Sequence, residues 1–280
     1  PLPMSMRWQP MKPKYLAFPY VIWMALFVVA PIFFVLMYAF TTKNGGFTFE
    51  NFQNMLNYSG VFIRSFRLAL IATAVCLLIA YPFSCALAKE SARFQRVTIL
   101  LIMLPMWMNS LLRTYAWMSI LEKTGLLNQL LTLLHLPTVS IINTETAIVI
   151  GMICDFLPFM VLPIYSVITK IDPSLIQAAE DLGATPSEVF RKVVFPLSLS
   201  GVLSGITMVF VPAVSTFVIS QLLGGGKNLL LGDLIEMQFL GTAYNPYLGS
   251  AISFVMMIIV LLCMWIMNKF GAGEEQAVML

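Results

Sequence analysis

Long apolar stretches alternate with short polar ones along almost the whole chain. Each apolar stretch is long enough, at about 1.5 Å per residue in a helix, to cross roughly 30 Å of hydrocarbon. Several contain proline, which membrane helices tolerate because neighbouring groups re-satisfy the freed carbonyls. The pattern predicts an all-α membrane protein with about six transmembrane helices, at residues 16–40, 65–88, 97–120, 145–170, 193–222 and 247–268.

A polar segment at residues 171–196 lies between the fourth and fifth apolar stretches. Asp172 is placed to cap a helix whose first residue is Pro173, where a missing N–H does no harm. Apolar side chains then recur with a period of about 3.6 residues, and Gly183 is typical of a residue that follows a helix end. The apolar stripe consists of Leu175, Ile176, Ala179 and Leu182. The first half of the segment is therefore predicted to be a short amphipathic helix.

The second half of this segment starts another helix at once. Thr185 is the expected N-cap, Pro186 is the first helical residue, and Glu188 completes a capping box. We therefore predict two short helices joined by an elbow at Gly183.

The composition is that of an integral membrane protein. The 280 residues are 59% hydrophobic and 10% charged, against about 25% charged in soluble domains, and the mean hydropathy is +0.88. The net charge of +3 is too small to indicate a nucleic-acid partner. The four cysteines form no CxxC pair, and a single histidine, His135, cannot build a metal site. We therefore expect no metal and no other cofactor.

The distribution of lysine and arginine predicts the orientation, because cytoplasmic loops carry an excess of these residues. With the N-terminus inside, ten of the sixteen lie in cytoplasmic segments and five lie on the outer side. Both termini and the polar segment are then cytoplasmic. The ten are Arg7, Lys12, Lys14, Lys89, Arg93, Arg96, Lys170, Arg191, Lys192 and Lys269, and the five are Lys43, Arg64, Arg67, Lys123 and Lys227.

The polar segment also carries a family signal. The inner-membrane permeases of type I ATP-binding cassette (ABC) importers have a loop that reads Glu-Ala-Ala, three residues, Gly, nine residues, an aliphatic residue, any residue, Leu and Pro. The segment resembles this loop, with Gln177 where the family has glutamate. The matching residues are Gln177, Ala178, Ala179, Gly183, Val193, Phe195 and Pro196, with Glu180 and Asp181 near the first three.

The resemblance implies that the loop docks into a groove on a cytoplasmic ATPase subunit. The alternative is an amphipathic loop that lies on the membrane surface. The resemblance also implies two copies of that ATPase, a second related permease chain, and an extracytoplasmic binding protein that delivers the substrate. The expected location is the inner membrane of a bacterium.

ATP hydrolysis is not expected of the chain itself. The nearest match to a phosphate-binding P-loop, at residues 224–228, has Gln221 where the first glycine belongs and Asn228 where the hydroxyl belongs. We therefore expect a transport subunit and not an enzyme.

The chain divides into three parts under this interpretation. Residues 1–60 hold a cytoplasmic N-terminal segment, the first helix and the first outer loop, residues 61–270 form the permease core, and residues 271–280 form a cytoplasmic tail. The first apolar stretch is longer than the core of a signal peptide and lacks a small-x-small cleavage site, so it should remain as a membrane anchor.

Two further segments, at residues 105–115 and 222–235, are similar to the permeases of polyamine (spermidine/putrescine) importers. A polyamine carries ammonium groups joined by methylenes, so its pathway needs carboxylates or aromatic faces and an apolar wall. The candidate pathway residues are Asp155, Trp107, Tyr115, Asp233 and Glu236.

Each candidate has a structural alternative. For Asp155 it is an ion pair with Arg113, which lies at a similar depth. For the aromatic residues it is the interfacial belt of a membrane protein, and for Asp233 and Glu236 it is a solvated loop.

Two alternatives concern the whole chain. One is an ABC permease for another small solute. The other is an autonomous secondary transporter or channel, a class that often shows inverted repeats, of which the sequence has no second copy.

Overall fold

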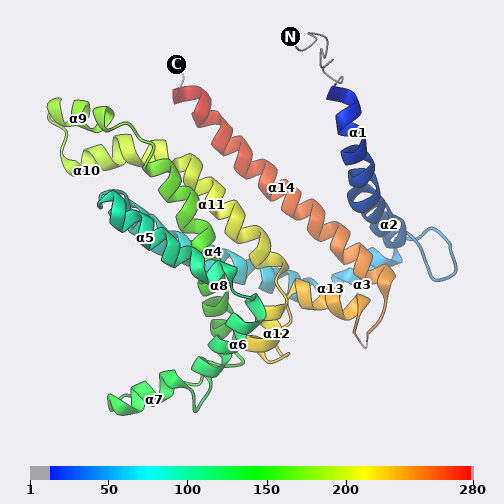
Figure 1. Ribbon diagram of the computed structural model, residues 1–280. Coiled ribbons are helices and arrows are strands. Elements are labelled where there is room, and N and C mark those ends of the chain that lie inside the picture. The colour runs from blue at the N-terminus through cyan, green and yellow to red at the C-terminus, as the bar shows by residue number, and fades with distance from the viewer. Residues whose placement is uncertain (1–12, 242, 279–280) are drawn as a thin grey trace, which may run out of the picture.

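The computed structural model describes residues 13–241 and 243–278, and most of them are helical (Figure 1). Extended pairing within these residues is an isolated bridge between Thr41 and Phe47. The all-α prediction is therefore confirmed. The elements are α1 (Pro13–Met24), η1 (Ala25–Val29), α2 (Ala30–Ala39), α3 (Glu50–Leu56), α4 (Ser59–Ala88), α5 (Ala92–Met103), η2 (Leu104–Trp107), α6 (Ser110–Leu121), α7 (Leu126–Leu133), α8 (Glu145–Ile168), α9 (Pro173–Asp181), α10 (Pro186–Val189), η3 (Phe190–Val194), α11 (Phe195–Ser215), α12 (Val218–Gly224), α13 (Leu231–Phe239) and α14 (Pro246–Val278).

The described residues contain 5 helices that are long and apolar enough to cross a membrane, or 6 spans if one bent pair of helices counts as a span. This agrees with the prediction of about six. The single helices are Phe18–Ala39, Ser59–Ala88, Glu145–Ile168, Pro186–Ser215 and Pro246–Met267, and the bent pair is Ala92–Trp107 with Ser110–Leu133.

The third predicted span, residues 97–120, is wrong as a single helix. The helices on either side of its break are bent by 96°. Pro105 cannot donate a helical hydrogen bond, and Met108 is extended, with φ −77° and ψ 148°. Asn109 then caps α6 by accepting the Leu111 N–H at 2.8 Å. One helix therefore ends and another begins in the middle of the apolar stretch.

The fifth predicted span, residues 193–222, is wrong at both ends. The helix begins at Pro186, inside the polar segment, and runs through α10, η3 and α11 to Ser215. Thr216 is extended, with ψ 143°, so α11 stops there and α12 follows as a separate helix. The second helix of the polar segment and the fifth span are therefore one continuous helix.

Helices α4, α8 and α11 pack together at the centre of the fold. Helix α11 approaches α8 closely because it has glycine at two positions one turn apart. A Cβ atom on Gly201 would lie 2.9 Å from the Pro163 carbonyl oxygen, and one on Gly205 would lie 2.7 Å from Met160 Sδ. Small residues at this spacing allow membrane helices to pack backbone to backbone.

Helix α14 lies to one side of this centre, and the first span lies beyond it (Figure 1). Ring contacts of Tyr38 with Tyr247 and of Phe40 with Phe254 join these two spans. None of the apolar window of Phe18–Ala39 is buried, so this span offers its surface to lipid or to another chain.

The two ends of the molecule carry different elements. The start of α1, the end of α14 and the α9–α10 hairpin lie toward one end, and α3, α6, α7, α12 and α13 lie toward the other (Figure 1). The α9–α10 hairpin, which lies in the polar segment, is thus separated from the second group of short helices by the length of the spans.

Candidate functional site

The polar segment begins with the helix that its capping residues predict. Asp172 accepts the Ser174 N–H at 2.9 Å, and this hydrogen bond lowers the pKa of the Asp172 carboxyl. Helix α9 ends at Asp181, and Gly183 has φ +84°, in the left-handed region. The Gly183 N–H donates to the Glu180 carbonyl at 2.8 Å. The predicted elbow at this glycine is therefore confirmed.

The second helix of the segment also starts as predicted. Glu188 Oε2 accepts the Thr185 N–H at 3.0 Å, and Thr185 Oγ1 accepts the Glu188 N–H at 3.4 Å, which is a capping box. The π-helix η3 ends at Val194, two residues before Pro196, whose ring removes the N–H of a regular helical turn. Pro196 therefore lies within a continuous helix that connects the elbow to α11.

The elbow presents an apolar side chain to solvent. Leu182 is 89% exposed, and Leu175 is also exposed, so only Ile176 and Ala179 of the predicted stripe are partly buried. A cavity of about 390 Å³ lies where α9 and α10 face the ends of α4 and α8. Of the residues predicted to dock on an ATPase, Gln177, Ala178, Glu180, Asp181 and Gly183 are exposed, as is Pro196. The loop therefore has a free outer surface.

The structure brings Arg113 and Asp155 together. Arg113 Nε lies 2.5 Å from Asp155 Oδ1, and the two side chains are 14% and 5% exposed. Arg113 Nη1 also donates to the Pro105 carbonyl at 2.7 Å. Arg113 therefore joins three elements, since Pro105 precedes the break, Arg113 follows it, and Asp155 lies on α8.

The two aromatic candidates face outward. Trp107 ends η2 at the break and is 74% exposed, and Tyr115 on α6 is also exposed. Their rings are thus available to lipid, to another chain or to a passing substrate.

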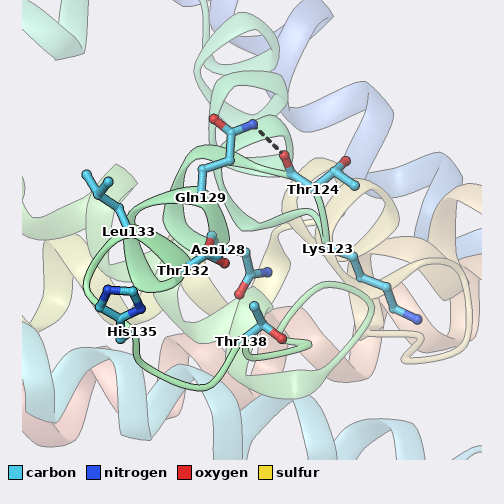
Figure 2. A pocket seen from close by; sticks show the side chains of 8 residues that line it. All are labelled: Lys123, Thr124, Asn128, Gln129, Thr132, Leu133, His135 and Thr138. Carbon is cyan, nitrogen blue, oxygen red and sulfur yellow. Dashed lines mark hydrogen bonds between the residues drawn. The ribbon is translucent and has the colours of Figure 1, made fainter.

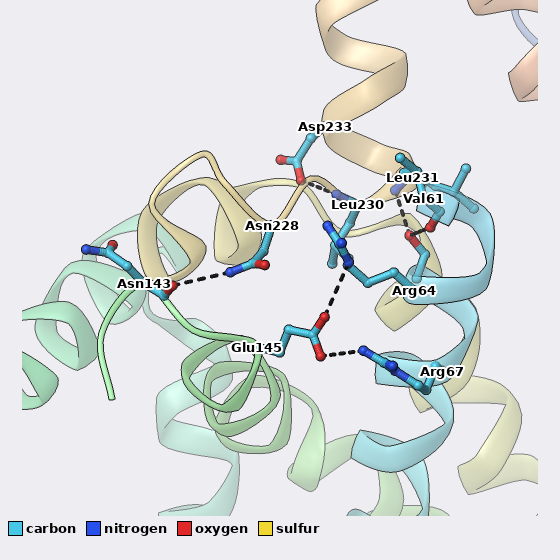
Figure 3. A network of polar contacts seen from close by, with 10 residues as sticks. Val61, Arg64, Arg67, Asn143, Glu145, Asn228, Leu230, Leu231 and Asp233 are labelled. Carbon is cyan, nitrogen blue, oxygen red and sulfur yellow. Dashed lines mark hydrogen bonds and ion pairs between the residues drawn. The ribbon is translucent and has the colours of Figure 1, made fainter. Parts of the chain in front are cut away.

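The two carboxylates that follow the glycine loop have separate environments. Asp233 is buried and accepts the Leu230 N–H at 2.8 Å, so it caps α13 (Figure 3). Burial raises the pKa of Asp233 to about 6. The solvated-loop alternative is therefore wrong for Asp233. Glu236 is partly buried and accepts a hydrogen bond from the Gln221 side chain.

Glu145 forms a charge cluster that the sequence analysis did not identify. It pairs with Arg64 at 3.3 Å and with Arg67, so the start of α8 is tied to α4 (Figure 3). The sequence contains the residues that form it, because Glu145 starts one predicted span and two arginines lie at the outer end of another. Which helices meet there could not be read from it.

An open surface hollow of about 660 Å³, lined mainly by residues of polar type, lies beside α7 (Figure 2). Asn128 holds its wall in place, because its side chain donates to the Glu122 and Val139 carbonyls and accepts the Val139 N–H. No group of three or more His, Cys, Asp or Glu side chains able to hold a metal occurs in the described residues. The hollow is lined by Lys123, Thr124, Asn128, Gln129, Thr132, Leu133, His135 and Thr138.

Comparison with known proteins identifies relatives along most of the chain. The profile of the family described as binding-protein-dependent transport system inner membrane component matches residues 12–272. The spermidine/putrescine transport system permease protein PotB of Haemophilus influenzae is 38% identical over 255 residues, which cover 87% of this chain and 88% of that protein. PotB of Escherichia coli is 37% identical over 247 residues, which cover 85% and 90%.

Solved structures share the fold at lower sequence identity. A chain of a bacterial ABC transporter involved in the import of the acidic polysaccharide alginate has a TM-score of 0.75 at 18% identity, covering 92% of this chain and 94% of that one. A chain of the methionine ABC transporter in an inward-facing conformation has a TM-score of 0.60 at 15% identity, covering 79% and 98%.

These matches exclude an autonomous secondary transporter or channel. The family profile extends over nearly all of the described residues, and relatives that are 37% and 38% identical cover most of the chain. The chain therefore belongs to the family of binding-protein-dependent transport system inner membrane components and is a multi-pass, inner-membrane permease subunit of an ABC importer.

Proposed function

We propose that this permease subunit imports polyamines such as spermidine and putrescine and forms one half of the translocation pore. The observation that carries the proposal is the 38% identity, over most of both chains, to a permease that is named for these two substrates. The buried carboxylate Asp155 supports it, because a cationic substrate needs negative charge along an apolar route.

The α9–α10 loop couples this pore to an ATPase. Its apolar tip, Leu182, is 89% exposed, which suits insertion into a groove on another protein. The docking surface consists of Gln177, Ala178, Ala179, Glu180, Asp181 and Gly183. Because α10 continues into α11 through Pro196, a force on the elbow moves a central helix of the fold.

The energy source is a separate cytoplasmic ATPase dimer. The segment that comes closest to the P-loop sequence pattern includes Gly225 and Gly226. Both have positive φ in a turn after α12, and a Cβ atom on Gly225 would lie 2.2 Å from Asn143 Oδ1. This turn therefore packs against a neighbouring loop. A second permease chain and an extracytoplasmic binding protein complete the importer.

Both termini face the cytoplasm in this proposal. The start of α1 and the end of α14 share one end of the molecule with the α9–α10 loop, as this orientation requires (Figure 1). The excess of lysine and arginine in the segments at that end favours the cytoplasmic side.

The proposed substrate pathway uses Asp155, Trp107 and Tyr115 near the break in the third span, and Asp233 and Glu236 toward the outer end. The aromatic rings offer faces to ammonium groups. Asp233 is buried here, so its contribution requires a conformation in which α13 has moved.

Transport by the assembled importer tests the proposal. The chain is reconstituted in proteoliposomes with its second permease, the ATPase and the binding protein, and ATP hydrolysis and uptake are measured. We expect spermidine or putrescine to stimulate both, and the chain by itself to hydrolyse no ATP.

Two controls make this test specific. An assembly without the binding protein should show no stimulation by either amine. Stimulation by an uncharged or anionic solute, with none by amines, would contradict the proposed substrate, and ATP hydrolysis by the isolated chain would contradict the proposed role.

A further inference from the structure

Arg113 is the resident counter-ion of a buried carboxylate, and it is also held by a second group. Its Nε lies 2.5 Å from Asp155 Oδ1, and its Nη1 donates to the Pro105 carbonyl at 2.7 Å. If the ion pair with Asp155 breaks, Arg113 therefore still keeps its hydrogen bond to the Pro105 carbonyl.

The ion pair is a short contact between two largely buried side chains. A buried carboxylate needs a cation beside it, but charge alone does not require that cation to be arginine. Another cation can therefore neutralise Asp155 in place of the guanidinium.

Two other carboxylates near the outer end of the spans, Glu145 and Asp233, are less suited to such an exchange. Glu145 is held by two arginines, and Asp233 caps α13 through the Leu230 N–H. Asp155 pairs with one arginine in the described residues, and that arginine also donates a hydrogen bond to the Pro105 carbonyl.

Asp155 also lies next to a break in the membrane span. Arg113 reaches both Asp155 and the Pro105 carbonyl, so the carboxylate is close to the point where the helix is interrupted and bent by 96°. In secondary transporters, which are a different class, interrupted helices often form the substrate site. Trp107, which ends η2 at the same break, presents an exposed aromatic ring.

We propose that Asp155 is an ammonium-binding site of the pathway and that Arg113 occupies it between transport cycles. An ammonium group of the substrate replaces the guanidinium at Asp155, and Arg113 remains bonded to Pro105. Each cation carries one positive charge, so the carboxylate stays neutralised throughout the exchange. This inference rests on the proposed function, because it requires an alkylammonium substrate.

The test compares single and paired neutralisation. Asp155→Asn, Arg113→Gln and the double variant are each assembled with the other subunits. Uptake of radiolabelled spermidine is measured, together with direct spermidine binding to the assembly without its binding protein. Arg64→Gln with Glu145→Gln is the matched control, because it neutralises another arginine–carboxylate pair between spans.

We expect Asp155→Asn and the double variant both to lose uptake by about tenfold or more, with direct binding lost as well. Arg113→Gln removes the internal competitor, so it should lower the half-saturating spermidine concentration in direct binding by about threefold. The control pair should leave direct binding unchanged.

The double variant also distinguishes exchange from a purely structural role. If the pair only held the bend in place, neutralising both partners would restore uptake and binding toward the unmodified level, and this result would overturn the inference. If the unmodified assembly transports other solutes but no polyamine, the proposed function itself fails. Thermal unfolding of each assembly identifies a variant that has lost its fold, and Arg113→Lys, which keeps the charge, should retain uptake.

Discussion

At the scale of single residues, the elbow depends on the backbone of one glycine. Gly183 has φ +84°, and a Cβ atom there would meet nothing within 4 Å, so a side chain would strain the backbone without a clash. We predict that Gly183→Val costs about 1–3 kcal/mol of local strain and lowers substrate-stimulated ATP hydrolysis in the assembled importer. Gly60→Ala is the control, since that site is equally open but has no positive φ. Full stimulation with the valine variant would contradict the prediction.

At the scale of elements, the contact between α8 and α11 depends on two glycines that face backbone atoms and Met160. We predict that Gly201→Leu separates the two helices and destabilises the fold by about 1–3 kcal/mol, because the Pro163 carbonyl cannot move aside as a flexible side chain can. The melting temperature of the detergent-solubilised protein measures this. Gly205→Ala should have a smaller effect, since its nearest neighbour is the flexible end of Met160. An unchanged melting temperature for the leucine variant would show that the helices do not pack as described.

At the scale of the whole molecule, the arrangement of the ends predicts the topology in the membrane. We expect Asn44→Cys to react with a membrane-impermeant thiol reagent from outside intact cells, and Ser187→Cys to react only after the cells are opened. Both positions are exposed: Asn44 lies in the loop between α2 and α3, and Ser187 lies in α10 at the opposite end of the spans. The four native cysteines are replaced by alanine so that they do not react, and this cysteine-free chain is the control. Labelling of Ser187→Cys in intact cells would reverse the proposed orientation.

Features that depend on neighbouring residues were predictable from the sequence. Asp172, Gly183, Thr185 and Glu188 act on backbone groups within a few positions of themselves, so the helix–elbow–helix shape follows from residue order. The number of spans follows equally well, because length and hydropathy decide which helices can cross a membrane. The break in the third span was missed because proline within an apolar stretch is compatible with both a continuous and an interrupted helix.

The sequence by itself therefore determined the membrane class, the approximate number of spans, the shape of the α9–α10 loop and the family of the chain. The sequence offered the Arg113–Asp155 pair as one of two alternatives, and the tertiary structure decided for contact. Only the tertiary structure showed that Glu145 meets Arg64 and Arg67 and that Asp233 is buried. The physical reason is range: a cap or a turn is a local equilibrium along the chain, whereas a buried charge takes its partner from whichever helix packs beside it.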